Sequence, residues 1–227
     1  MIGDKKILAI TLARGGSKRI PKKNIAVING KTLLQYTTDE VKKSKYIDKH
    51  VVSTDSTDII AVCDDLNVEY HRRPPTLAKD TTTSADAIMD VVVHSANEDF
   101  DYIVEIMATN PLKKVDDIDG VIKKLYETKA DSVVSVVRIW DHHPSRVKYI
   151  ENDRMVDFYP EVPESRRQDL TPAAYVRNGS VYATTRESFV QHGVRLGPDA
   201  RPYIMSEKRT INIDEPVDLE VAKVLLR

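Results

Sequence analysis

Hydrophobic and polar positions follow two different periods along the first 140 residues of this 227-residue chain. Short apolar runs that end at turn residues predict buried strands, and apolar positions three and four residues apart predict amphipathic helices. The predicted strands span residues 6–13, 50–53, 101–107 and 132–138, and the predicted helices span 32–44, 57–66, 81–96 and 116–125. Because the two alternate, the pattern predicts an α/β fold with a mainly parallel sheet and helices on both faces.

The periodicity changes after Arg138. Residues 140–176 are rich in Pro, Arg and Asp and contain two short strand candidates, at 146–150 and 155–159. We interpret this segment as a small inserted β-rich region that forms a dimer contact. A strand at 179–184 and a closing helix at 217–226 return to the main pattern. Residues 1–227 are therefore predicted to form a single domain with one excursion at 140–176.

Charge and composition narrow the class of protein. The chain has 34 basic and 35 acidic residues and a net charge of −1, which argues against nucleic-acid and membrane-surface binding. The single cysteine, Cys63, excludes an intramolecular disulfide and is expected to be a buried structural residue. The apolar stretch near the N-terminus is too short to span a bilayer and has no signal-peptide cleavage pattern. We expect a cytoplasmic protein.

The segment 12–24 shows the clearest chemistry. Gly15 and Gly16 follow a predicted buried strand, so the backbone can turn sharply and present N–H groups to an anion. Five cations lie within ten residues: Arg14, Lys18, Arg19, Lys22 and Lys23. A charge run alone would indicate a solvated loop, but strand, glycines and cations in this order favour a phosphate site. The order matches neither the P-loop nor Gly-x-Gly-x-x-Gly, which disfavours a dinucleotide-binding enzyme.

The loops after Ala13, Ser53, Met107 and Arg138 follow the carboxyl ends of predicted strands, which meet at one rim where such sheets bind ligands. Along this rim the chain resembles the CMP-sialic acid synthetases (acylneuraminate cytidylyltransferases) and their relatives for other acidic sugars. The segment 12–24 resembles the family signature, and the likeness continues in order in seven further segments: 51–55, 72–81, 107–113, 142–144, 166–169, 178–182 and 211–214. The resemblance implies a three-layer α/β/α Rossmann-like nucleotidyltransferase fold.

The resemblance also implies roles for single residues. Arg14 and Lys23 are expected to hold the β- and γ-phosphates of CTP, beside the backbone of Gly15, Gly16 and Ser17. The ribose and cytosine are expected to contact Asn24, Arg73 and Ser84, and the backbone near Ala108 to read the base edge. Gln168 and the pair Arg166–Arg167 belong to the region expected to close over the sugar, either in the same chain or from the partner subunit of a homodimer. The matched segments add Leu12, Ala13, Met107, Thr109 and Asn178 to the expected substrate site.

The implied reaction is an in-line attack of a sugar's anomeric hydroxyl on the α-phosphorus of CTP, with release of pyrophosphate. Catalysis of this kind rests mainly on positioning and charge stabilisation. Asp214 is expected to bind the Mg²⁺ cofactor and to act in catalysis with Arg14 and Lys23, with Asn212 as a second metal ligand. No general base for the hydroxyl is evident.

Two positions depart from the family pattern. Asn212 replaces the first aspartate of Asp-x-Asp, which puts the number of metal ions in doubt, and Met107 replaces a glutamine that contacts the sugar. The acidic nine-carbon sugar therefore stays open among sialic, legionaminic and related acids. An eight-carbon keto acid as substrate, and a nucleotide-binding protein without catalysis, stay open as alternatives.

Several other candidates have simple structural interpretations. The neighbouring His142 and His143 lack a third ligand at useful spacing, so a zinc site is disfavoured. The pair Asp116–Asp117 is interpreted as compensation of a helix dipole. Asp55 and Asp80 are equally consistent with helix caps and with supporting roles at the site.

Overall fold

The computed structural model describes residues 1–95, 98–161 and 166–227. Its centre is a seven-stranded sheet in the order β11-β7-β10-β6-β1-β4-β5. Pairing is parallel between β1 and β4, β1 and β6, β4 and β5, and β7 and β11, whereas β10 runs antiparallel to both β6 and β7. The strands are β1 (Ile7–Leu12), β4 (Lys49–Thr54), β5 (Glu69–Arg72), β6 (Tyr102–Ile106), β7 (Ser132–Ile139), β10 (Ala174–Thr185) and β11 (Ala200–Ile204). The predicted mainly parallel sheet is confirmed.

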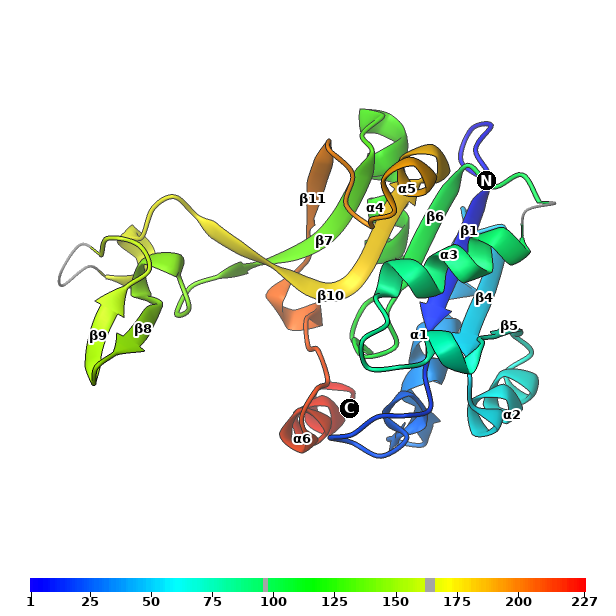
Figure 1. Cartoon of the computed structure of the whole chain (residues 1–227), viewed down its shortest axis with the longest axis horizontal. Helices are drawn as coiled ribbons and strands as arrows, with labels where there is room; N and C mark the ends of the chain where they lie inside the picture. Colours follow the sequence, from blue (N-terminus) through cyan, green and yellow to red (C-terminus); the bar gives the residue numbers. More distant parts are fainter. Residues whose placement is uncertain (96–97, 162–165) are drawn as a thin grey trace.

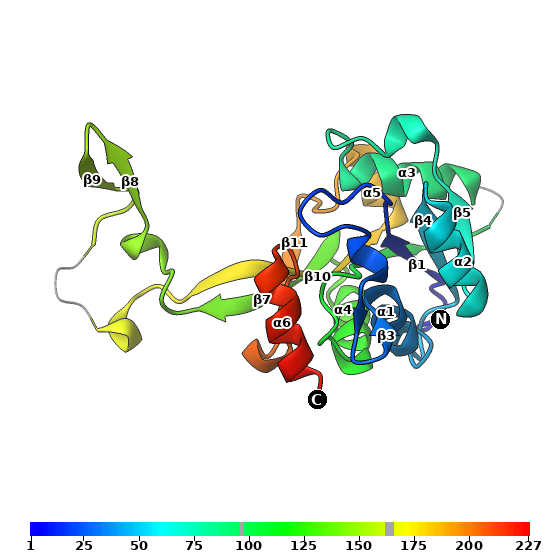
Figure 2. The ribbon, with the colours of Figure 1, turned by 90° about the horizontal axis from the view of Figure 1, so that it is seen from below.

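Helices cover both faces of this sheet, which gives the expected three layers (Figures 1 and 2). The helices are α1 (Leu33–Val41), α2 (Thr57–Asp65), α3 (Ser84–His94), α4 (Val115–Thr128), α5 (Arg186–His192) and α6 (Pro216–Leu225). One apolar core joins α4 to β1, β6 and β10, and a second joins α3 to β1 and β6. Burial of apolar side chains on the two faces therefore holds the layers together.

The helix α4 shows how sequence pattern becomes packing. The predicted apolar stripe of Ile118, Val121, Ile122 and Leu125 is fully buried against the sheet. Asp117 is buried as well, and its two carboxylate oxygens accept hydrogen bonds of 2.8 and 2.7 Å from Arg209. The interpretation of Asp117 as simple dipole compensation was therefore incomplete, because this carboxylate joins α4 to the 3-10 helix η5 (Glu207–Arg209).

The segment between β7 and β10 leaves the body of the protein. The outer halves of β7 and β10 pair with each other and extend away from the helices, and β8 (Lys148–Glu151) and β9 (Arg154–Asp157) form a hairpin at the far end (Figure 1). The 3-10 helices η3 (Pro144–Arg146) and η4 (Arg167–Asp169) lie in the same segment. We call residues 140–176 the arm.

Several boundaries differ from the sequence prediction. β5, β11 and α5 had not been predicted, and neither had the small pair β2 (Val27–Ile28) and β3 (Lys31–Thr32). The helix expected at 81–96 begins at Ser84 because Thr83 caps it, and its expected end at residue 96 lies outside the described residues. Ser56 does occupy the N-cap position of α2, but its side chain makes no capping hydrogen bond. None of the described helices is both long and apolar enough to cross a bilayer.

Candidate active site

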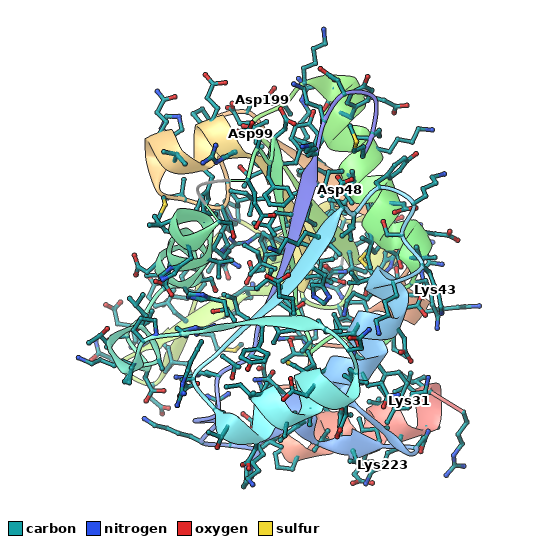
Figure 3. The ribbon with its side chains drawn as sticks, turned by 90° about the vertical axis from the view of Figure 1, so that its right-hand side faces the viewer. Lys31, Lys43, Asp48, Asp99, Asp199 and Lys223 are labelled. Carbon is teal, nitrogen blue, oxygen red and sulfur yellow. The ribbon has the colours of Figure 1, made fainter. Side chains whose placement is uncertain are left out.

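The candidate site lies where β1, β4 and β6 end at the same edge of the sheet. In Figure 3, Asp48 and Asp99 lie toward the end where β1 begins, and Lys31 and Lys223 lie toward the opposite end, near α6. The segments 13–26 and 211–214 meet at this second end, because Lys23 Nζ donates to the Ile213 carbonyl over 2.9 Å. The cations expected to bind phosphate are therefore gathered at the carboxyl edge, as the parallel topology requires.

The turn after β1 is tight for a reason that the sequence did not reveal. A Cβ on Gly15 would lie 2.7 Å from the Cβ of Ser56, so only glycine allows this loop to pack against the start of α2. The Gly15 N–H donates to Asp55 Oδ1 over 2.9 Å, whereas a Cβ on Gly16 would meet open space. Asp55 thus supports the loop and is not a helix cap. Asn24 also supports it, because its side-chain amide donates to the Arg14 carbonyl.

Each of the five cations in the loop pairs with a carboxylate from elsewhere in the chain. Arg14 and Lys18 both contact Asp80, and the other pairs are Arg19–Glu215, Lys22–Asp58 and Lys23–Asp214. Hydrogen bonds from Lys18 and then Arg14 lower the pKa of Asp80, which keeps this carboxylate ionised. Each loop cation therefore has a carboxylate counter-ion in this structure. Asp80 belongs to this cluster and does not cap a helix.

A cavity of about 220 Å³ lies beside the loop. It is lined by Leu12, Arg14, Arg73 and Ser84, all expected site residues, together with the turn that precedes α3. Arg73 is 5% exposed and donates from Nε to Ser53 Oγ over 3.0 Å and from Nη2 to the Ser53 carbonyl over 2.9 Å. These bonds use two of its five N–H donors and fix the plane of the guanidinium. Burial lowers the pKa of Arg73, but a guanidinium stays charged after such a shift.

A second cavity, of about 410 Å³, adjoins the first at Ser84. Its lining is both charged and apolar. The arginines are Arg177 and Arg195, and the apolar side chains are Met107, Val137 and Val176. The lining also includes Asn178, Tyr182 and Asn212. Gly179 lies in its wall with φ +58°, where the register of β10 shifts. A cavity of this size with two cations can hold a small acidic molecule.

A polar network centred on the buried Glu105 joins Ser84, which lines both cavities, to Arg195, which lines the second. Glu105, the next-to-last residue of β6, accepts a hydrogen bond from Arg195 Nη1 over 2.6 Å and another from Ser84. The Arg195 guanidinium stacks 4.4 Å from the ring centroid of Tyr182. Burial raises the pKa of Glu105, and Arg195 opposes that shift. The sequence analysis missed both residues, although a glutamate inside an otherwise apolar strand was a usable signal.

The expected metal ligands lie together. Asp214 is half exposed and accepts hydrogen bonds from Lys23 Nζ, over 2.9 Å, and from the Asn212 amide. The Asn212 side-chain oxygen accepts from Thr109 Oγ1 over 2.8 Å. Asn212 therefore binds Asp214 through its amide nitrogen, and its oxygen accepts one hydrogen bond and keeps a second lone pair. Asp214 supplies the charged oxygen of this pair and Asn212 a neutral one.

The turn after β6 and the wall of the second cavity contain further expected residues. Ala108 is buried in the turn after β6, and Lys113 holds this turn by donating to the carbonyls of Met107 and Asn110, each over 2.7 Å. Burial lowers the pKa of Lys113 to about 7. Asn178 lines the second cavity, but its amide also binds Ser135, Thr210 and the sulfur of Met205.

Arg167 and Gln168 lie apart from both cavities. They belong to η4, in the outer part of the arm (Figure 2). Arg167 contacts Asp141 over 3.3 Å and lies 5.2 Å from the ring centroid of Trp140. His143 is buried and bonds to Ser145 and the Pro172 carbonyl, as a structural residue would. The fold of one chain therefore does not bring Arg167 and Gln168 to its own site.

A larger cavity, of about 1040 Å³, lies at the other end of the sheet. Its lining includes Lys5, Tyr102 and Thr185, where β1 and β6 begin and β10 ends. We assign the chemistry to the smaller cavities, because ligands of such sheets bind at the carboxyl edge and the cation-rich loop lies there.

Residues 8–190 match the model of the cytidylyltransferase family. The chain belongs to this family. It is 29% identical to the pseudaminic acid cytidylyltransferase of Campylobacter jejuni, over 98% of this chain and 97% of that protein. It is 33% identical to the N-acylneuraminate cytidylyltransferase of Oncorhynchus mykiss, over 97% of this chain but only 50% of that protein. The family resemblance expected from the sequence is confirmed.

Solved structures agree in fold. A CMP:2-keto-3-deoxy-manno-octonic acid synthetase complexed with CTP superimposes with a TM-score of 0.75 at 18% identity, covering 98% of both chains. A 4-diphosphocytidyl-2C-methyl-D-erythritol synthase superimposes with a TM-score of 0.70 at 15% identity, covering 99% of both chains. The Rossmann-like nucleotidyltransferase fold expected from the sequence is therefore confirmed.

Proposed function

We propose that this cytidylyltransferase transfers CMP from CTP to the anomeric hydroxyl of a nonulosonic acid and releases pyrophosphate. The observation that carries the proposal is the pair of adjoining cavities that share Ser84. One contains Arg14 and Arg73 beside the cation-rich loop, and the other contains Arg177 and Arg195. A nucleotide and an acidic sugar in these two cavities would have their reacting groups next to each other at the shared wall.

The chain's own residues supply charge and position for this reaction. Arg14 and Lys23 would hold the β- and γ-phosphates, in place of the carboxylates of Asp80 and Asp214 that they contact now. The negative charge that develops on the leaving pyrophosphate would be stabilised by cations whose positions are already fixed. The two hydrogen bonds to Ser53 fix the orientation of the Arg73 guanidinium, and its remaining N–H donors would bind the cytosine or ribose.

We further propose Mg²⁺ as the cofactor, held by Asp214. One carboxylate, phosphate oxygens and water form a common Mg²⁺ ligand set, and Asp214 is exposed enough to take part. When bound, the ion would neutralise phosphate charge. The Asn212 oxygen accepts one hydrogen bond from Thr109 and keeps a second lone pair, so it would supply a neutral ligand atom beside Asp214.

The second cavity favours one kind of nonulosonic acid. Met107 packs in a cluster with Val134, Val136 and Tyr182, and its side chain cannot donate a hydrogen bond. An apolar wall of this kind favours a sugar with a methyl group over one with a hydroxyl at the same place. We therefore propose a deoxygenated acid such as pseudaminic or legionaminic acid, rather than sialic acid.

A homodimer would complete the site. A two-stranded hairpin with little other packing is only marginally stable in water, and the hairpin of the arm exposes large apolar side chains. These are Tyr149, Ile150, Met155, Phe158 and Tyr159. A partner that covers them would stabilise the arm and bring Arg167 and Gln168 toward the other subunit's sugar cavity.

We further propose that the protein works in the cytoplasm. Cys63 is buried, and burial raises the pKa of its thiol to about 11, so the thiol stays protonated at neutral pH. A protonated thiol is compatible with a reducing cytoplasm.

The deciding experiment is mass spectrometry of the products after incubation with CTP, Mg²⁺ and single sugars. The panel contains sialic, legionaminic and pseudaminic acids and an eight-carbon keto acid. We expect a CMP-sugar and pyrophosphate with a methyl-bearing nonulosonic acid, and no product from the Lys23→Met variant. Turnover of the eight-carbon acid alone would refute the nonulosonic acid proposal. Calorimetric binding of CTP without turnover of any sugar would instead identify an inactive homologue.

The apolar wall can be tested separately with Met107→Gln. Glutamine restores the amide that the family pattern has at this position and can bond to a sugar hydroxyl. We expect kcat/KM for sialic acid to rise by about tenfold relative to kcat/KM for the methyl-bearing acids. Such a change corresponds to about one or two kcal/mol of difference in transition-state binding between the two sugars. KM for CTP serves as the control and should not change. An unchanged ratio between the sugars would show that Met107 does not face the substrate.

A further inference from the structure

Two histidines and an aspartate meet where β5 packs beside α3, outside both cavities. His71 lies on β5, and Asp90 and His94 lie one turn apart on α3. Each of the three residues can present one ligand atom, and these atoms lie within 4.8 Å of one another. The cluster is independent of the cation-rich loop and of the expected Mg²⁺ ligand Asp214.

The carboxylate of Asp90 lies close to both imidazoles. Its Oδ2 is 2.7 Å from His71 Nε2, and its Oδ1 is 3.6 Å from His94 Nδ1. The same His94 Nδ1 bonds to the Asp90 backbone carbonyl over 2.8 Å, a bond that an ion at this nitrogen would replace. The two imidazole rings have centroids 4.4 Å apart, so they also contact each other. Ligand atoms of a tetrahedral site with bonds of about 2.0 Å are about 3.3 Å apart, so small movements would place all three around one ion.

Burial also suits a metal site. Asp90 is 11% exposed and His71 is 13% exposed, whereas His94 is 60% exposed. A mostly buried carboxylate and imidazole are held in place by the protein, and the third ligand can close over an ion that enters from solvent. Positions i and i+4 of a helix present their side chains on one face, so Asp90 and His94 can bind the same ion. Water would complete the coordination.

We propose that His71, Asp90 and His94 form a binding site for a divalent transition-metal ion such as Zn²⁺. Two imidazole nitrogens and one carboxylate oxygen are ligands for Zn²⁺, whereas Mg²⁺ prefers oxygen alone, so this ion is distinct from the proposed cofactor. The bound ion would fasten β5 to α3. Arg73 follows β5 directly and Ser84 begins α3, so the fastened elements are those that place two residues of the nucleotide cavity.

The test uses the full-length protein without a histidine tag, in excess Mg²⁺ so that Asp214 is occupied. Co²⁺ is the spectroscopic probe, because four-coordinate Co²⁺ absorbs strongly in the visible range, and Zn²⁺ is then added to displace it. His94→Ala removes an exposed ligand with little risk to folding. His192→Ala is the matched control, because His192 is also an exposed histidine in the last turn of a helix.

We expect strong Co²⁺ absorption that Zn²⁺ abolishes in the wild type and in His192→Ala. The His94→Ala variant should bind about tenfold more weakly or worse. Zn²⁺ should also raise the melting temperature of the first two proteins and not of the third. Equal Zn²⁺ affinity in wild type and His94→Ala, or a wild-type spectrum of hydrated Co²⁺, would overturn the proposal and leave His71–Asp90 as a plain hydrogen bond. CTP turnover in Mg²⁺ alone is a separate measurement and does not depend on this outcome.

Discussion

At the scale of single residues, neighbouring side chains of the same type have different roles. Arg72 is exposed at the end of β5, and Arg73, the next residue, is buried against Ser53 and lines the cavity of about 220 Å³ proposed to bind the nucleotide. Both belong to the segment that resembles the family, so the sequence alone assigns no difference in burial. The pleat of the strand decides it, because successive side chains point to opposite faces.

This pair gives a matched test of the nucleotide cavity. Arg73→Lys keeps the positive charge but removes the planar fork that Ser53 orients, so CTP binding should weaken by about ten- to a hundredfold. Arg72→Lys is the control and should bind CTP as the wild type does. Isothermal calorimetry with CTP measures both. Equal affinities in the two variants would remove Arg73 from the nucleotide site.

A second residue, His50, predicts how stability depends on pH. Its Nε2 bonds to Thr11, and its Nδ1 is buried without a partner among the described residues. Burial, and then the charges of Lys113 and Lys42, lower the pKa of His50 to about 4. The unfolded chain therefore takes up a proton near pH 6.5 and the folded chain only near pH 4, so stability contributed by neutral His50 is lost as the pH falls through this window.

Replacement by a residue that does not titrate should remove this loss. Between about pH 7 and pH 5 the wild type should lose about 2 kcal/mol more unfolding free energy than His50→Gln. Urea unfolding at the two pH values measures the difference. The wild type and the variant losing the same amount would show that His50 titrates normally in the folded chain.

At the scale of elements, the strongly periodic segments could be predicted and the edges of the sheet could not. The apolar run of β1 and the apolar stripe of α4 gave both elements their correct type. β5 and β11 were missed because they are the two edge strands, which need fewer apolar residues. Pro202 within β11 further weakened the strand pattern there, although proline is tolerated in edge strands. α5, with seven residues, is too short for a clear helical period.

The join between α4 and η5 is testable with adjacent aspartates. Asp117→Ala removes the carboxylate that binds Arg209 and caps the first turn of α4, which should cost about 2–3 kcal/mol of unfolding free energy. Asp116→Ala changes an exposed neighbour in the same turn and should cost less than about 1 kcal/mol. Denaturant unfolding compares the two. A similar loss in both variants would mean that Arg209 contributes little through Asp117.

At the scale of the whole molecule, the arm stands out because its hairpin lies away from the body of the protein. It extends from β7 and β10 away from both cores and ends in a hairpin with exposed apolar side chains (Figures 1 and 2). Met155 is 80% exposed and Ile150 is 77% exposed. Apolar surface of this kind far from the body of a protein is typical of a subunit contact.

If the proposed homodimer forms through the hairpin, a charge placed there should separate its subunits. Met155→Lys is expected to convert a dimer into a monomer in light scattering coupled to size-exclusion chromatography, because an unpaired ammonium cannot be buried in an apolar contact. Val217→Lys, on the exposed side of α6, is the control and should stay dimeric. If Arg167 and Gln168 act on the partner's sugar, kcat/KM for the sugar should fall with dimer loss while CTP affinity stays the same. A wild type that is monomeric at working concentration would refute the dimer.

The sequence by itself determined the alternation of strands and helices, the cation-rich loop after β1 and the family. These follow from local chemistry: hydrophobic period, glycine and charge are all readable from neighbouring residues. Only the tertiary structure decided which residues meet across the sheet. It placed Glu105 between Ser84 and Arg195, joined Asp117 to Arg209, and brought His71 beside Asp90. Such contacts join residues that are nineteen to ninety-two positions apart, and no local pattern encodes them.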